Sequence, residues 1–248
     1  MYLRSLPISF SMCDPSAHLS PFSAIRLVQD AACERLRSLS LDEMTLKANY
    51  HAIWVLRRNV LRFFTMPEWT VPVRLQSGLS LVSPAKIWMD TEILLESGEP
   101  VMQSRQELCA IDLESFAIRK TGTVGVTPDL PVREPLEGLE YTRFTMENPV
   151  PAGTGSVQYL HLDCCGHANN TELLRFIFNA RPSGFFLDNT PERLEIHYLN
   201  QAFEGDAVQV LASRSGDTDI YALACGGRQI MECAMTVRPS AGSGRIPR

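Results

Sequence analysis

The sequence lacks both a long apolar run and an excess of basic residues. No apolar stretch among its 248 residues approaches the roughly 18 that a membrane-spanning helix needs. The formal net charge is -5 and the pI is near 5.6, which excludes the positive surface typical of nucleic-acid binding. Residues 1–7 contain only a short apolar stretch, which is not typical of a signal or transit peptide. We therefore expect a soluble, cytoplasmic protein that binds neither nucleic acid nor a membrane.

The cysteines lack the spacing of a disulfide framework or a structural zinc site. There are seven, an odd number, and no C-x-x-C pair occurs, which is typical of a reducing compartment. His161, Cys164, Cys165 and His167 are clustered, but no second ligand pair has the spacing of structural zinc. We therefore expect no metal and no other cofactor.

An internal repeat is the main feature that is present. The spacing Asp-x-x-x-His occurs at Asp14–His18 and again at Asp163–His167, and a helical apolar pattern follows each time. Farther on, residues 66–75 parallel 202–210, and residues 98–102 parallel 227–231. The length suffices for two domains of about 120 residues. The two halves are therefore interpreted as divergent copies of one unit.

Each half is predicted to contain one helix followed by antiparallel strands, an α+β pattern. The first helix is expected at 21–38, and the strands at 52–56, 59–64, 69–76, 86–95 and 100–112. The second helix is expected at 171–180, and the strands at 194–199, 207–212, 219–224 and 229–237. The predicted domains are residues 1–125 and 153–240, joined by a proline- and glutamate-rich linker at 126–152 and followed by a mobile tail at 241–248.

The segment around the second Asp-x-x-x-His carries the candidate chemistry. A carboxylate and an imidazole on one short loop, Asp163 and His167, can orient a water and move its proton. Asn169 or Asn170 is suited to cap the following helix, whose positive end favours negative charge on oxygen. The alternative is an asparagine-rich loop that caps an ordinary helix.

Residues 163–170 read Asp-Cys-Cys-Gly-His-Ala-Asn-Asn and follow a first helix, a strand meander and a linker. This order resembles the acyl-ACP thioesterases, in which the second hot-dog unit begins with Asp-x-Asn-x-His-x-Asn-Asn and a helix. Residues 29–34 resemble the family's first helix, and residues 53–55 its first long strand. The resemblance implies a tandem hot-dog fold, each unit a long antiparallel sheet wrapped around a central helix. It also implies hydrolysis of fatty acyl-ACP in fatty acid biosynthesis.

The resemblance assigns the catalytic positions to Asp163, Cys165, His167 and Gln201, with Asn169 and Asn170 at the helix start. Two of these depart from the family pattern. Cys165 stands where the family has asparagine, and Gln201 where it has a glutamate on the strand after the helix. A cysteine cannot offer the donor and acceptor of an amide, and a glutamine cannot act as a base. Cys165 is open to two interpretations, a nucleophile activated by His167 or a buried structural cysteine.

The resemblance also implies that the first unit binds the acyl chain. The candidate wall residues, each equally explained as ordinary core, are Ile25, Val28, Trp54, Phe63 and Trp88. Four arginines could meet the acyl carrier protein or its phosphopantetheine phosphate, or simply form a solvated strand face. These are Arg57, Arg58, Arg62 and Arg74. The pair Asp14 and His18 is interpreted as a vestige of duplication.

Two other functions fit the same pattern. A non-catalytic acyl-thioester or acyl-carrier binding protein would explain the departures at Cys165 and Gln201. A hot-dog dehydratase or hydratase also uses a histidine and a carboxylate. The sequence leaves open whether the protein forms a homodimer.

Overall fold

The structure is a computed structural model that describes residues 1–182 and 184–240. It divides into two compact units, Met1–Glu140 and Tyr141–Arg248, with the boundary inside the predicted linker. The predicted tail at 241–248 lies outside the described residues. In the described part of the chain, no helix combines the length and the apolar character that crossing a bilayer requires.

The first unit contains a long central helix, α1 (Pro21–Ser38), as predicted. Ser20 caps it by accepting a hydrogen bond from Ser23 N (3.1 Å), and Pro21 occupies the first turn, where its missing N–H costs nothing. A second helix, α2 (Glu43–Tyr50), was not predicted. Because Leu46 is its one buried residue, its sequence carries no apolar period.

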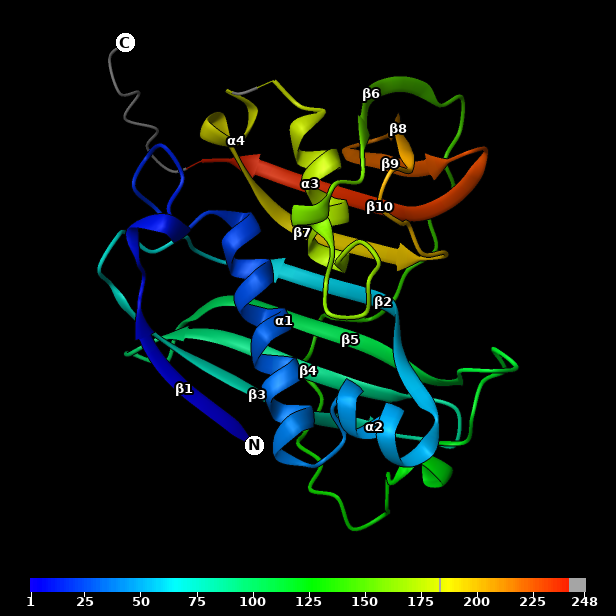
Figure 1. The fold of residues 1–248 in the computed structure, drawn as a ribbon. Helices are drawn as coiled ribbons and strands as arrows, with labels where there is room; N and C mark the ends of the chain where they lie inside the picture. The colour runs from blue at the N-terminus through cyan, green and yellow to red at the C-terminus, as the bar shows by residue number, and fades with distance from the viewer. Residues whose placement is uncertain (183, 241–248) are drawn as a thin grey trace. The chain divides into compact units, whose positions relative to one another are not determined.

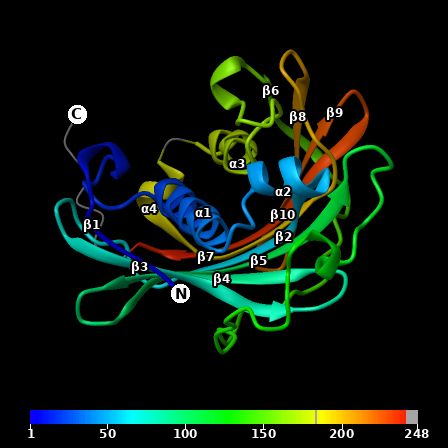
Figure 2. The same cartoon turned by 60° about the horizontal axis from the view of Figure 1, so that its bottom comes forward.

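The first unit's sheet has five antiparallel strands in the order β1-β3-β4-β5-β2, and α1 lies across one of its faces (Figures 1 and 2). The predicted runs at 52–56 and 59–64 form one strand, interrupted by a bulge between Leu56 and Arg58. The edge strand β1 was missed because its side chains are mostly exposed and show no apolar alternation. The strands are β1 (Tyr2–Pro7), β2 (Ala52–Phe63), β3 (Pro72–Val82), β4 (Ile87–Leu95) and β5 (Pro100–Asp112).

The second unit repeats this plan with a shorter central helix and mostly shorter strands. Its helix α3 (Asn170–Asn179) buries Leu173, Leu174 and Ile177, and the short helix α4 (Phe185–Asp188) follows. The strand order is β7-β10-β9-β8-β6, all antiparallel. The strands are β6 (Val150–Ser156), β7 (Asn189–Tyr198), β8 (Ala207–Ser215), β9 (Thr218–Cys225) and β10 (Arg228–Pro239).

The two Asp-x-x-x-His loops are held by the same backbone hydrogen bonds. Each follows a short 3-10 turn, η1 (Phe10–Met12) or η3 (Tyr159–His161). Each aspartate N–H donates to the histidine carbonyl, over 2.8 Å in the first unit and 3.0 Å in the second. The residue after each histidine donates to a later loop over 2.8 Å, Leu19 to Pro67 O and Ala168 to Ala202 O. The units therefore repeat one backbone pattern, as the sequence repeat predicted.

The repeat places left-handed backbone at equivalent positions with different residues. In the second unit these positions are Gly166 and Gly205, with φ of 81° and 87°. In the first unit they are Ala17 and Thr70, with φ of 63° and 71°. A β-branched side chain is strained in this region, whereas glycine is not. The first unit therefore stores strain that the second avoids.

We expect Thr70→Gly to raise the free energy of unfolding by about 1 kcal/mol, because it relieves this strain and outweighs the extra freedom of glycine in the unfolded chain. Its matched counterpart is Gly205→Ala, which should lower stability by about 1 kcal/mol. A Cβ at residue 205 would meet no atom within 4 Å, so the cost is conformational. Thermal unfolding followed by circular dichroism measures both. A lower Tm for Thr70→Gly would contradict the interpretation.

A buried ion pair on the first sheet fastens part of the linker. The Arg105 guanidinium donates to both Asp90 carboxylate oxygens, Nε over 2.8 Å and Nη2 over 2.6 Å. The same pair holds Leu136, whose N–H donates to Asp90 (2.7 Å) and whose carbonyl accepts from Arg105 (2.8 Å). The side chains of Asp90 and Arg105 are 0% and 5% exposed. The bidentate pair therefore satisfies its own charges and a backbone segment that has no strand partner of its own.

Candidate functional site

The second Asp-x-x-x-His loop forms a compact turn ahead of α3. The backbone bond from Asp163 N to His167 O and a second one from Gly166 N to Asp163 O (3.1 Å) close it. Cys165 N donates to Asp163 Oδ1 over 2.8 Å, and this leaves Oδ2 directed at His167, with Nδ1 at 3.5 Å. Both side chains are 22% exposed, so solvent or a ligand can reach them. The structure thus brings together Asp163 and His167, as their spacing predicted.

Asn169 is the cap of α3, and Asn170 is its first residue. Asn169 Oδ1 accepts from Thr171 N over 2.8 Å and from Thr171 Oγ1 over 2.9 Å. The N–H of Asn169 donates to His161 O over 2.8 Å, so neither this group nor the Thr171 N–H is available to a ligand. Among the backbone N–H groups at the start of α3, that of Asn170 is therefore the remaining candidate for binding an oxyanion.

The two departures from the family pattern lie in exposed positions. Cys165 is exposed, so the interpretation as a buried structural cysteine is wrong. Gln201 is also exposed, and it lies in the loop after β7 instead of on the strand. The strand ends at Tyr198 because the next two N–H groups, those of Leu199 and Asn200, both turn to Ile230 O. The bond between Ala168 and Ala202 nevertheless joins the Gln201 loop to the Asp163 loop.

Four of the five candidate acyl-wall residues are buried in the first unit, Ile25 and Val28 on α1 and Trp54 and Phe63 on β2. Trp88 lies on the opposite face of the sheet. Neighbouring side chains of a strand point to opposite faces, and the buried Ile87 and Met89 on either side of Trp88 take the face toward α1. On the face away from α1, Trp88 Nε1 donates to Glu107 over 3.2 Å. An acyl slot beside α1 cannot include Trp88.

The four candidate arginines do not form one patch. Arg57 and Arg58 are exposed on β2, while Arg62 donates to the linker at Glu137 O over 3.5 Å. Arg74 lies on β3, and β4 and β5 separate that strand from β2. Spacing alone did not predict this, because the strand order depends on long-range pairing.

The first Asp-x-x-x-His loop has the same backbone but other side-chain contacts. Asp14 Oδ1 accepts from Ser16 N, Ser16 Oγ and His18 N over 2.8, 2.6 and 3.2 Å. His18 Nδ1 lies 2.9 Å from Ser16 O, and its Nε2 is 4.0 Å from Glu68. The His18 imidazole therefore contacts the backbone carbonyl of Ser16 and not the Asp14 carboxylate.

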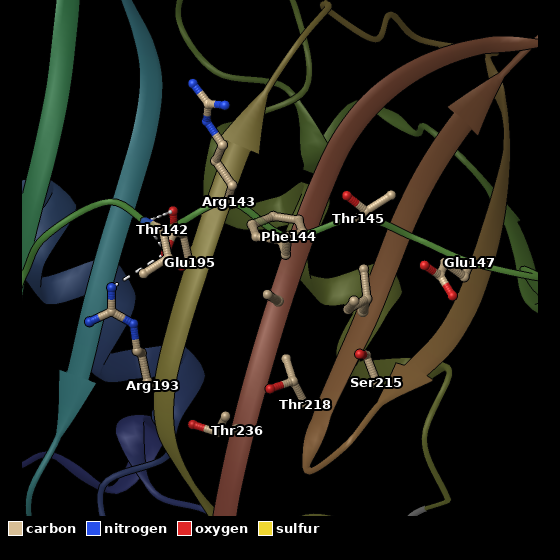
Figure 3. Close-up of a pocket in the computed structure, with 12 residues that line it drawn as sticks. Thr142, Arg143, Phe144, Thr145, Glu147, Arg193, Glu195, Ser215, Thr218 and Thr236 are labelled. Atoms are coloured by element: carbon tan, nitrogen blue, oxygen red, sulfur yellow. Dashed lines mark hydrogen bonds and ion pairs between the residues drawn. The ribbon is translucent and has the colours of Figure 1, made fainter.

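A cluster that the sequence did not predict lies on the second sheet, where residues 142–147 of the predicted linker cross the strands (Figure 3). Thr142 donates to the buried Glu195 through its N–H (2.9 Å) and its hydroxyl (2.6 Å). Burial alone would raise the pKa of Glu195, but hydrogen bonds from His197 and Thr142 and the charge of Arg193 lower it. Thr142 and Glu195 are 53 positions apart, so no local pattern could reveal the contact.

Two cavities lie in the second unit. The first, about 350 Å³, is lined by Glu195, Phe144 and Thr145 among others, and Figure 3 draws its lining residues. The second, about 520 Å³, lies between β6 and α3 and is lined by His161, Arg175 and Phe176. His161 also accepts the Asn169 N–H, so the second cavity adjoins the loop that carries Asp163 and His167.

Two units, each a helix across an antiparallel sheet with one loop pattern repeated, define a double hot-dog protein. Residues 153–238 match the family model for the acyl-ACP thioesterase C-terminal domain. This part of the second unit is therefore similar to the acyl-ACP thioesterases, in agreement with the resemblance found in the sequence.

Solved structures agree on the fold. The chain is similar to an acyl-ACP thioesterase from Bacteroides thetaiotaomicron, with a TM-score of 0.87, 16% identity and coverage of 95% of this chain and 97% of that one. It is also similar to a 12:0-ACP thioesterase from Umbellularia californica, with a TM-score of 0.85, 15% identity and coverage of 96% and 97%. No curated protein sequence matches.

Proposed function

We propose that the protein hydrolyses the thioester of fatty acyl-ACP and releases the free fatty acid and the carrier. The observation that carries the proposal is the pairing of Asp163 with His167 (3.5 Å) at the start of α3, inside the segment that matches the thioesterase domain. A thioester carbonyl is already electrophilic, so an oriented water, a base and an oxyanion donor suffice.

In this mechanism Asp163 holds the His167 tautomer that carries its proton on Nδ1. Nε2 then accepts a proton from water as the water attacks the thioester carbon. The negative charge that develops on the carbonyl oxygen is placed at the α3 N-terminus, where the Asn170 N–H and the helix dipole stabilise it. The carbon–sulfur bond breaks, and the proton on Nε2 passes to the leaving thiolate of the carrier.

The rival function is a non-catalytic acyl-thioester binding protein, which the neutral Gln201 favours. Mass spectrometry of the fatty acid released from acyl-ACP and from acyl-CoA separates the two. Catalytic release that depends on enzyme concentration supports hydrolysis. Tight binding of acyl-ACP with no release beyond the spontaneous rate supports the rival. A preference for acyl-CoA would leave the chemistry in place but remove the carrier from the proposal.

We expect Gln201→Glu to raise kcat or shift its pH optimum, with little change in KM. A carboxylate beside the attacking water acts on the chemical step and not on acyl binding. The exposed position of Gln201 allows the added charge without a folding penalty. The pH–rate profiles of both proteins on one acyl-ACP test this. Glu204→Gln, on the same loop, is the control, and identical profiles for parent and Gln201→Glu would mean that residue 201 does not reach the water.

A further inference from the structure

We propose that Asp163, Cys165 and His167 form a binding site for Zn²⁺. The potential ligand atoms of these three residues all lie within 4.8 Å of one another, the one such group of histidine, cysteine and acidic residues in the described chain. The site uses the same loop as the proposed hydrolysis but does not depend on that activity.

The distances are near those of a bound metal. Zinc binds sulfur at about 2.3 Å and nitrogen or oxygen at about 2.1 Å, so tetrahedral ligands lie roughly 3.5 Å apart. Asp163 Oδ2 and His167 Nδ1 are already 3.5 Å apart. The Cys165 ligand atom lies within 4.8 Å of both, and this cysteine is exposed, so an ion can reach all three ligands from solvent.

The backbone of the loop fixes the three ligands in advance. They stand at alternate positions of a five-residue turn, which the Asp163–His167 and Gly166–Asp163 backbone bonds close. Gly166, with φ of 81°, supplies the left-handed residue that this turn requires. The bond from Cys165 N to Asp163 Oδ1 orients the carboxylate, as contacts beyond the ligands do in known metal sites.

The ligand types select the metal. One thiolate, one imidazole and one carboxylate suit Zn²⁺ and not the hard cations Mg²⁺ and Ca²⁺. Three protein ligands leave a fourth position for water, the pattern of non-structural zinc sites. The absence of a second ligand pair in the sequence, which excludes a structural site, therefore does not exclude this one. On binding, the Cys165 thiol forms a sulfur–zinc bond and releases its proton to solvent.

The first loop shows what the thiol contributes. Ser16 occupies the place of Cys165, and its hydroxyl donates to Asp14 (2.6 Å). His18 Nδ1 lies against Ser16 O instead of facing the carboxylate. A neutral hydroxyl does not replace a thiolate as a zinc ligand. Metal binding and hydrolysis also need different tautomers at residue 167, because zinc takes the Nδ1 lone pair and the hydrolytic role needs a proton there.

The test uses the untagged, reduced full-length chain and CoCl₂ as a spectroscopic substitute for zinc. We expect a cobalt–thiolate absorption band that ZnCl₂ abolishes by competition. Cys165→Ser should lose the band, and Asp163→Asn and His167→Ala should weaken zinc binding at least about tenfold by calorimetry. The matched control is Cys164→Ser, which removes the neighbouring exposed thiol and should keep the band.

Two results would overturn the proposal, no band in the parent chain or a band that survives Cys165→Ser and disappears in Cys164→Ser. Circular dichroism establishes that each variant is folded before its spectrum is read. Release of fatty acid from acyl-ACP, measured separately in EDTA, tests the hydrolase proposal without metal. Failure of one proposal is therefore distinguishable from failure of the other.

Discussion

His167→Ala is expected to reduce the rate of acyl-ACP hydrolysis roughly a hundredfold or more, the usual cost of losing a general base. The substitution removes the imidazole that lies 3.5 Å from Asp163 and leaves the backbone bonds of the loop intact. The effect should fall on kcat more than on KM, because the imidazole acts on the water and not on the acyl chain. Single-turnover release of fatty acid measures the chemical step.

The matched control for this prediction is His18→Ala. It removes the histidine from the same position of the first loop, where Nδ1 contacts Ser16 O at 2.9 Å and not Asp14. We expect its turnover to stay near that of the parent, as the interpretation of this pair as a vestige requires. A folded His167→Ala protein with parental turnover would disprove the assignment, and a large loss in His18→Ala alone would move the chemistry to the first unit.

Asp90→Ala should lower the free energy of unfolding of the first unit by about 3–5 kcal/mol, the cost of leaving a buried charge without its partner. Arg105 would then remain 5% exposed with no carboxylate, and the Leu136 N–H would lose its acceptor. All three tryptophans lie in the first unit, so denaturation followed by their fluorescence reports on this unit.

Two variants define the size of this effect. Glu172→Ala breaks the ion pair with the half-exposed Arg175 on α3. Because such pairs contribute only about 0.3–0.5 kcal/mol, this variant should lower the free energy of unfolding by no more than that. Circular dichroism measures its unfolding, because the pair lies in the second unit. The double variant Asp90→Leu with Arg105→Met removes both charges and should recover much of the loss. If Asp90→Ala were no more destabilising than Glu172→Ala, Asp90 would not be the anchor that the structure indicates.

Local sequence predicted the fold where local signals decide it. Ser20, Pro21 and the apolar period specify α1, and both copies of the loop are visible as a spacing of four residues. The strand β1 was not predicted because it is stabilised by pairing with β3 and not by its own mostly exposed side chains. The helix α2 was missed for a similar reason, since it depends on its Asp42 cap and a single buried leucine.

In the candidate site, too, contacts within one segment could be predicted from the sequence, and contacts between distant segments could not. Asp163, His167 and the Asn169 cap come from one segment, and their proximity follows from spacing. The position of Gln201 depends on bonds to Ile230 from another strand, and the separation of Trp88 from the other wall residues depends on which face of β4 points toward α1. The contact of Thr142 with Glu195 joins segments far apart in the chain, and neither segment has a local sequence pattern that predicts it.

Backbone hydrogen bonds, together with one aspartate side chain in each, hold both Asp-x-x-x-His loops in shape. Every residue except proline carries the same N–H and C=O, so substitutions can accumulate in a duplicated loop while its geometry persists. Ser16 opposite Cys165, and Thr70 opposite Gly205, are differences of this kind. If the halves arose by duplication, one copy can change its chemistry while the other keeps it. The similarity of the two halves is then preserved in the backbone structure after their sequences have diverged.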